Sequence, residues 1–254
     1  MFLPSHGTPY DLRFGLFGIP VTVSPFFWVM AVLLGFSWLS REPGGPANLV
    51  AWVLCVFVSI ILHEFGHALT MRAFGHYPEV VLHHFGGYAT YRGHETAGRS
   101  LIISAAGPAA QIVVFLAILI GACVWMGVNP GVLFESPRYL LASHYLVAEG
   151  LASAGLFESN TPVYALVDSM LFVNLIWPLF NLLPVIPLDG GRILASGLEL
   201  MKVKRAEEWA QRVGVVVAIL GAIFFLFQGM FLAGAMFAYM AMANYLALKG
   251  ESFG

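Results

Sequence analysis

Long apolar runs, separated by short segments rich in glycine, proline or charge, constrain this 254-residue chain more than any other feature. A helix needs about 20 mainly apolar residues to cross a bilayer core of about 30 Å. The chain is 59% hydrophobic and only 10% charged. Six runs of suitable length predict an all-α polytopic membrane protein with about six transmembrane helices, at residues 25–40, 48–74, 99–127, 163–187, 207–227 and 230–247.

Two short segments depart from this helical pattern. Residues 12–23 and 80–91 are rich in aromatic and β-branched residues and are interrupted by glycine, as strands and hairpins are. They predict a small β-sheet on the cytoplasmic side, close to the second span. Gly86 and Gly87 are expected to form its turn or a point of close backbone approach.

We expect one membrane-embedded domain that covers residues 1–254. Its predicted parts are a β-rich segment at 1–24, the first three spans at 25–127, an outer segment at 128–162 and the last three spans at 163–254. The outer segment is expected to contain a short amphipathic helix near 139–156. The final two spans are separated at Gln228 and Gly229, because one helix through that tract would be much longer than the bilayer is thick.

The distribution of basic residues predicts the orientation of the chain. If the N-terminus is cytoplasmic, every Lys and Arg except Arg41 and Arg138 falls on the inner side, in agreement with the positive-inside rule. Both termini are therefore predicted to be cytoplasmic. The absence of a transit-like N-terminus favours a bacterial plasma membrane. With a formal net charge of −2 and no long basic block, the chain offers no surface for nucleic acid.

Ionisable side chains occur where the second span should be apolar. His63, Glu64 and His67 follow the apolar run 49–62, and helical residues four apart lie on one face. Burying such groups in hydrocarbon costs about 2.5–3.5 kcal/mol each on insertion scales, which argues against simple hydrogen bonding within a helix bundle and for a bound divalent ion. The spacing His-Glu-x-x-His is that of zinc hydrolases, in which the glutamate is the general base.

A catalytic zinc site uses three protein ligands and leaves the fourth position to water, so one more ligand is needed. Asp189 is the candidate, because Pro178, Pro184 and Pro187 should interrupt the helix before it. Irregular backbone at membrane depth is tolerated where it lines a polar cavity. Asp189 could also cap a short helix at 190–201, and the two roles are compatible.

Two asparagines precede this aspartate in the same segment. Asn181 could donate a hydrogen bond to the oxyanion that forms as a peptide carbonyl becomes tetrahedral, or it could satisfy backbone groups that the prolines leave free. Asn174 is predicted to be a polar helix-packing residue. With zinc and with Glu64 as the base, the predicted reaction is hydrolysis of a peptide bond.

The remaining polar residues carry weaker predictions. Four histidines could form a second metal site, although a solvated inner loop explains them better: His76, His83, His84 and His94. Gln111 lies in a run of small residues on the third span and is a candidate hydrogen-bond partner of a metal ligand. His144 and Glu149 of the outer segment show no evident chemistry, and Cys55 and Cys123 are expected to be buried packing residues.

Together these motifs resemble the site-2 proteases, a family of intramembrane zinc metalloproteases. The resemblance lies in His-Glu-Phe-Gly-His at 63–67, in Asn-x-x-Pro-x-x-x-x-Asp-Gly beginning at Asn181, in Ala-Gly-Pro at 106–108 and in Phe-Gly-Gly at 85–87. These motifs are spread over roughly residues 10–195, which is most of the chain.

The resemblance implies regulated intramembrane proteolysis, in which a single-span membrane substrate is cleaved in its membrane segment, usually after a first cut outside. It also implies one catalytic Zn²⁺ ion, with Glu64 as the base and Asn181 assisting. The implied metal ligands are His63, His67 and Asp189. The hairpin at Gly86 and Gly87 would bind substrate by β-addition. A minimal form of the family is expected, because the chain leaves no room for a PDZ or CBS domain.

Three other interpretations remain at this point. The chain could be a non-proteolytic membrane metal-binding protein or transporter, although it has no internal repeat and no polar path through several spans. It could belong to another class of membrane zinc protease, with Glu199 as third ligand. It could also be an inactive homologue retained as a scaffold. The oligomeric state is open.

Overall fold

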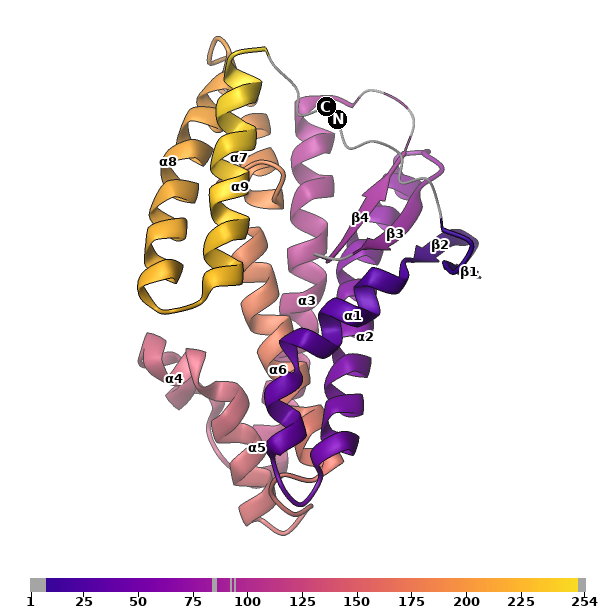
Figure 1. Cartoon of the computed structure of the whole chain (residues 1–254), viewed down its shortest axis with the longest axis vertical. Coiled ribbons are helices and arrows are strands. Elements are labelled where there is room, and N and C mark those ends of the chain that lie inside the picture. The colour runs from indigo at the N-terminus through magenta and orange to yellow at the C-terminus, as the bar shows by residue number, and fades with distance from the viewer. Residues whose placement is uncertain (1–7, 84–85, 92, 94, 251–254) are drawn as a thin grey trace. The chain divides into compact units, whose positions relative to one another are not determined.

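The structure, a computed structural model, describes residues 8–83, 86–91, 93 and 95–250 (Figure 1). These residues form two compact units. The N-terminal unit holds the described residues within 6–92 and 109–178, and the C-terminal unit holds those within 93–108 and 179–254. The helices α3 (Ala97–Met126) and α6 (Pro162–Asn181) each contribute residues to both units.

A four-stranded sheet in the N-terminal unit confirms the two predicted β segments. The strands are, in order across the sheet, β1 (Leu12–Leu16), β2 (Ile19–Val23), β3 (Glu79–His83) and β4 (Gly86–Thr90). The β1–β2 and β3–β4 pairs are antiparallel, and β2–β3 is parallel. Phe17 and Gly18 join β1 to β2 with positive φ angles of 51° and 75°, as a two-residue hairpin turn with the twist of its strands requires.

The second predicted span is the 29-residue helix α2 (Gly45–Ala73), which carries the motif at 63–67. Its buried side chains share one core with the sheet and with α6; Ile60, Val21, Leu82 and Val173 are among its members. The predicted proximity of the sheet to the second span is therefore correct. It results from burial of the apolar face of β2 and β3 against the helix.

The first predicted span, 25–40, is shorter in the structure. Helix α1 (Pro25–Leu34) has 10 residues, which is about 15 Å of helix and too short to cross a bilayer. After Gly35 the chain continues as the 3₁₀ helix η1 (Phe36–Ser40). A Cβ atom on Gly35 would lie 2.0 Å from the Trp52 ring, and the Trp52 indole N–H donates to the Ala31 carbonyl at 2.9 Å. Hydropathy cannot reveal such contacts.

The third and fourth predicted spans are α3 and α6, and α6 differs from its prediction at both the proline and the C-terminus. Pro178 lies inside α6 and does not end it; the helix continues to Asn181, well short of residue 187. The predicted outer segment between them contains the 3₁₀ helix η2 (Pro130–Phe134), α4 (Pro137–Leu141) and α5 (Ser143–Ser153). Val147 and Leu151 of α5 pack with apolar side chains of α3 and α6, which anchors this segment to the N-terminal unit.

The C-terminal unit contains α7 (Asp189–Leu200) and two long helices, α8 (Ala206–Phe227) and α9 (Phe231–Leu248). The helices α8 and α9 run side by side (Figure 1). Gly229, at a φ of 74°, lies in the turn between them, which confirms the predicted separation of the last two spans. A Cβ atom on Gly221 would lie 2.7 Å from the Phe237 ring, so the absence of a side chain lets the two helices approach closely.

Five helices of the described chain are long and apolar enough to cross a membrane: α2, α3, α6, α8 and α9. Large apolar side chains also lie on their outer surfaces, as Val216, Leu220 and Phe224 do on α8. Such a surface suits contact with lipid. The chain is therefore a multi-pass membrane protein, with five long helices and one short apolar helix where six spans were predicted.

Candidate metal centre

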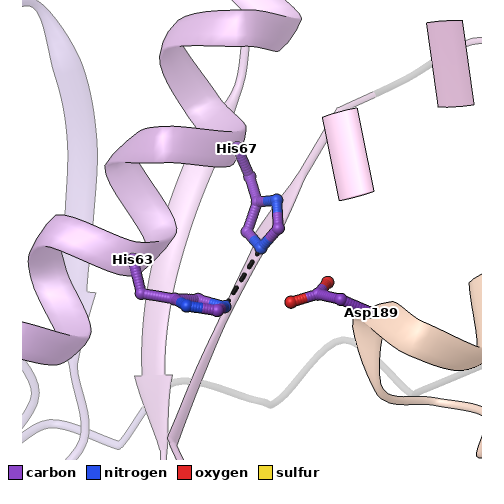
Figure 2. Close-up of side chains that lie close together, drawn as sticks. All are labelled: His63, His67 and Asp189. Atoms are coloured by element: carbon purple, nitrogen blue, oxygen red, sulfur yellow. Dashed lines mark hydrogen bonds between the residues drawn. The ribbon is translucent and has the colours of Figure 1, made fainter. Parts of the chain in front are cut away.

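His63 and His67 lie one turn apart on the buried face of α2, with 3% and 6% of their surfaces exposed. Their Nε2 atoms are 3.1 Å apart (Figure 2). The rings meet edge to face, with centroids separated by 4.8 Å. Two imidazole nitrogens directed at one point are the arrangement that a bound divalent ion requires.

The Nδ1 atom of His63 faces a glutamine from a different helix. Gln111 of α3 is fully buried, and its Oε1 atom lies 2.9 Å from His63 Nδ1. The Gln111 amide nitrogen donates to the carbonyl of Ser59, one turn before His63, at 3.1 Å. Gln111 therefore contacts a candidate metal ligand, as the sequence analysis expected, and the role of His63 as a ligand stays a prediction. Metal-binding histidines generally donate their second ring N–H to such an acceptor.

Asp189 supplies the third ligand atom of the group. His63, His67 and Asp189 each offer one ligand atom, and these atoms all lie within 4.8 Å of one another (Figure 2). Two imidazoles and one carboxylate fit zinc, which takes such ligands at about 2.0–2.2 Å and leaves a fourth position open at catalytic sites. Among the described residues, His63, His67 and Asp189 form the group of three His, Cys, Asp or Glu side chains that could hold a metal ion.

The backbone before α7 determines where Asp189 lies. The N-cap position is occupied by Leu188, so Asp189 is the first helical residue and the predicted capping role is wrong. A Cβ atom on Gly190 would lie 2.1 Å from the Leu182 carbonyl oxygen. One on Gly191 would lie 2.5 Å from the backbone nitrogen of Ile186. These two glycines are needed because the irregular segment between α6 and α7 folds back against the first turn of α7.

Glu64 is buried at 3% exposure and lies against strand β4. A Cβ atom on Gly87 would be 2.6 Å from Glu64 Cγ and 2.8 Å from Glu64 Oε1. One on the neighbouring Gly86, whose φ is 125°, would be 2.8 Å from the Trp177 ring. The predicted close backbone approach at Gly86 and Gly87 is therefore confirmed. Phe85, the first residue of that motif, lies outside the described residues.

The asparagines differ in what the structure reveals. Asn174 of α6 is fully buried and donates to Ser59 Oγ of α2 at 2.9 Å and to the carbonyl of Met170 at 2.8 Å. Its predicted role in helix packing is confirmed. Asn181 is the last residue of α6 and is partly buried. Its assistance to the reaction stays a prediction.

The alternative metal ligands do not join a three-residue group within the described part of the chain. The His76 ring packs on Tyr91 with centroids 4.2 Å apart, and His83 lies near Phe26. His84 and His94 lie outside the described residues. Glu199, the ligand required by the rival protease class, is exposed near the C-terminal end of α7.

One buried polar pair was missed by the sequence analysis. His144 of α5 and Asp168 of α6 form a hydrogen bond in which Nδ1 and Oδ1 are 2.5 Å apart, and Asp168 is 6% exposed. In the same outer segment, the Ser159 hydroxyl donates a hydrogen bond to the Glu149 carboxylate at 3.2 Å. An aspartate within a predicted span was the available signal, since an ionisable residue in a membrane helix has a partner by default.

The helical membrane fold and the paired histidines define a membrane protein with a candidate metal centre. The model of Peptidase family M50 matches residues 51–221, and the chain belongs to this family. Its fold is similar to that of the Site-2 Protease from Methanocaldococcus jannaschii, with a TM-score of 0.60 and 22% identity over 94% of this chain and 95% of that one. The resemblance noted from the sequence motifs is thereby confirmed.

Two relatives illustrate the similarity at the sequence level. Zinc metalloprotease MJ0392 of Methanocaldococcus jannaschii is 26% identical over 74% of this chain and 45% of its own length. Rip3 of Mycobacterium tuberculosis, named as a candidate zinc metalloprotease, is 29% identical over 75% of this chain and 45% of its own length. The chain spans less than half of the length of these relatives.

Proposed function

We propose that this protein is an intramembrane zinc endopeptidase that hydrolyses peptide bonds within or near the membrane spans of anchored substrates. The observation that carries the proposal is the convergence of the candidate ligand atoms of His63, His67 and Asp189 within 4.8 Å. Membership of Peptidase family M50 and relatives named as zinc metalloproteases support the same activity. Residues 1–254 would act as one membrane-embedded catalytic domain.

In this proposal His63, His67 and Asp189 hold one Zn²⁺ ion, which would polarise a peptide carbonyl and make a water molecule more acidic. Glu64 accepts a proton from the attacking water and passes it to the leaving amine. Its burial in a membrane helix supports this role, since ionisable side chains inside membrane helices are rare and usually functional. Asn181 donates a hydrogen bond to the oxyanion as the carbonyl becomes tetrahedral.

Strand β4 is the proposed substrate-binding element. It lies at one edge of the described sheet, and an edge strand offers backbone donors and acceptors to an extended peptide. Gly87 has no side chain that would collide with Glu64, and Gly86 has none that would collide with Trp177. The β4 backbone can therefore lie close to the Glu64 carboxylate. A substrate helix must unwind to reach the site, because a helical peptide bond is engaged in the hydrogen bonding of its own helix.

The proposed setting is a bacterial plasma membrane with both termini in the cytoplasm, which requires α1 and η1 together to form a sixth crossing beside the five long helices. This orientation places every Lys and Arg except Arg41 and Arg138 on the cytoplasmic side, in agreement with the positive-inside rule. Single-span membrane proteins would be the substrates, after a first cut outside the membrane, and cleavage would release a fragment to the cytoplasm.

The test is cleavage of a model single-span substrate by the purified protein in liposomes, with zinc content measured on the same samples. Glu64→Gln should retain zinc and reduce the cleavage rate by about 10²–10⁴-fold, the usual contribution of a general base. Glu199→Gln, a matched change at an exposed glutamate, should leave both unchanged. Asp189→Ala should lose stoichiometric zinc.

Each outcome addresses a separate part of the proposal. Cleavage by Glu64→Gln at the rate of the unmodified protein would contradict the mechanism. Tight stoichiometric zinc in Asp189→Ala would contradict the ligand assignment. Zinc binding without cleavage of any single-span substrate by the unmodified protein would favour the non-proteolytic metal-binding alternative.

A further inference from the structure

We propose that Gln111 is a positioning residue that holds His63 in one tautomer and thereby directs its Nε2 lone pair at the metal. The inference rests on the proposed function, because it takes His63 to be a zinc ligand. Gln111 is fully buried in α3, a helix apolar enough to span a membrane. A buried amide costs free energy unless its donors and acceptor are paired, so its partners determine what it does.

Ser59 determines which way the Gln111 amide faces. The amide nitrogen lies 3.1 Å from the Ser59 carbonyl oxygen, and a carbonyl oxygen only accepts hydrogen bonds. Rotating the amide by half a turn would bring two oxygen atoms together at this contact. Chemistry therefore selects between the two amide orientations, and Oε1 is the atom that faces His63.

The fixed amide then determines where the proton of His63 resides. Gln111 Oε1 lies 2.9 Å from His63 Nδ1, and an amide oxygen only accepts, so Nδ1 must carry the hydrogen. A neutral imidazole has one N–H group, which leaves Nε2 with its lone pair. This is the atom that lies 3.1 Å from His67 Nε2, on the side where the ligand atoms converge.

Ser59 is itself anchored by another helix. Its hydroxyl oxygen accepts a hydrogen bond from Asn174 Nδ2 at 2.9 Å, and Asn174 Nδ2 also donates to the Met170 carbonyl at 2.8 Å. Asn174, Ser59 and Gln111 are all 0% exposed. The network therefore joins α6, α2 and α3, and Gln111 Oε1 contacts the His63 ring.

The same bonds could serve only to hold the three helices together, and variants separate the two roles. Gln111→Leu removes both contacts at similar volume. Gln111→Glu keeps an oxygen that accepts from His63 Nδ1, and in its protonated form its O–H can donate to the Ser59 carbonyl in place of the amide. Asn174→Leu removes the helix contact at Ser59 and does not touch His63. Zinc affinity is measured on the full-length protein by chelator competition, and Co²⁺ absorption reports the ligand geometry.

Gln111→Leu should weaken zinc binding by about 10–100-fold, as loss of such an outer partner typically does, and should alter the Co²⁺ spectrum. Gln111→Glu should recover the affinity to within a few-fold, and Asn174→Leu should leave it unchanged. Unchanged zinc affinity in folded Gln111→Leu would overturn the proposal. Equal losses in all three variants would also overturn it, because they would show a purely structural role.

The tautomer can also be measured without zinc and without a variant of Gln111. In the zinc-free protein labelled with ¹⁵N-histidine, the His63 signals, assigned by their loss in His63→Ala, should show a protonated Nδ1 and a bare Nε2. A protonated Nε2 would overturn the inference. If the unmodified protein binds no zinc at all, the proposed function fails, and this spectrum still decides the inference about Gln111.

Discussion

The N-terminal unit contains two polar clusters, one partly buried and one buried, that differ in how their polar atoms are paired. In the outer cluster, His144 and Asp168 face each other directly, with Nδ1 and Oδ1 2.5 Å apart. In the inner cluster, His63 and His67 direct two Nε2 atoms at one point, 3.1 Å apart. The first pair is an acceptor with its donor. The second pair consists of two like groups that need a shared proton or cation between them.

This difference separates a polar cluster that holds helices together from one that is suited to binding a cation. The imidazole of His144 supplies what the Asp168 carboxylate requires, so the pair can hold α5 against α6 without any further ion. The histidines of α2 are instead arranged around a position that a cation would fill, with Asp189 contributing a third ligand atom.

The largest effect that this comparison predicts is on zinc binding in His67→Ala. Removing one of three ligands should reduce zinc affinity by about 10³-fold or more, because a zinc-binding free energy of about 10–16 kcal/mol is shared among few ligands. Zinc content after dialysis and chelator competition measure it. His144→Ala is the matched control and should keep stoichiometric zinc. Equal zinc loss in the two variants would remove the distinction between the clusters.

The next effect is on stability, and it belongs to the outer cluster. Asp168→Ala leaves His144 without its carboxylate and should reduce the free energy of unfolding by about 1–3 kcal/mol. Unfolding in mixed detergent, followed by circular dichroism, measures this change, and zinc content should not fall. The double variant His144→Ala/Asp168→Ala should be less destabilised than the sum of the single variants. Strict additivity would show that the pair contributes no coupling.

A smaller effect on turnover is expected from Gly87→Ala. The added Cβ atom would lie 2.6–2.8 Å from atoms of Glu64, so the carboxylate must shift, and the cleavage rate should fall by about 10–100-fold with zinc retained. Gly98→Ala is the control, because a Cβ atom there meets no neighbour within 4 Å. Normal turnover in Gly87→Ala would show that Glu64 tolerates displacement.

The smallest effect should come from Ser159→Ala at the periphery of the outer cluster. It removes one hydrogen bond to Glu149, of 3.2 Å, and should cost about 1 kcal/mol or less in the free energy of unfolding. Unfolding in mixed detergent again measures the change, with cleavage rate and zinc content unaffected. A loss larger than that of Asp168→Ala would indicate that the Glu149 contact, and not the His144 pair, anchors the outer segment.

Much of the fold could be predicted because hydropathy and glycine placement report directly on membrane spans and turns. The separation of α8 from α9 at Gln228 and Gly229 and the two β segments at 12–23 and 80–91 followed from such local signals. The first span was predicted too long, since the end of α1 depends on contact between Gly35 and Trp52. Pro178 was expected to interrupt a helix that in fact continues to Asn181.

Some features of the candidate site could likewise be predicted from local sequence, and others could not. The spacing of His63 and His67 places them on one helix face whatever the rest of the chain does, because helical geometry is local. The contact at His63 Nδ1 comes from Gln111, far away in the sequence, and the hydrogen bond of Asp168 comes from His144 of another helix. Hydrogen bonds between helices leave no periodic trace in a single sequence.

By itself, the sequence determined that this chain is a multi-pass membrane protein, that one helix carries a paired-histidine motif and that an aspartate after a proline-rich segment is the best third ligand. These conclusions rest on hydropathy, on helical periodicity and on the cost of placing ionisable groups in lipid. Only the tertiary structure decided which polar groups pair with one another and which candidate ligand atoms come close together. Those outcomes depend on distances of a few ångströms between residues far apart in the chain, and packing alone sets such distances.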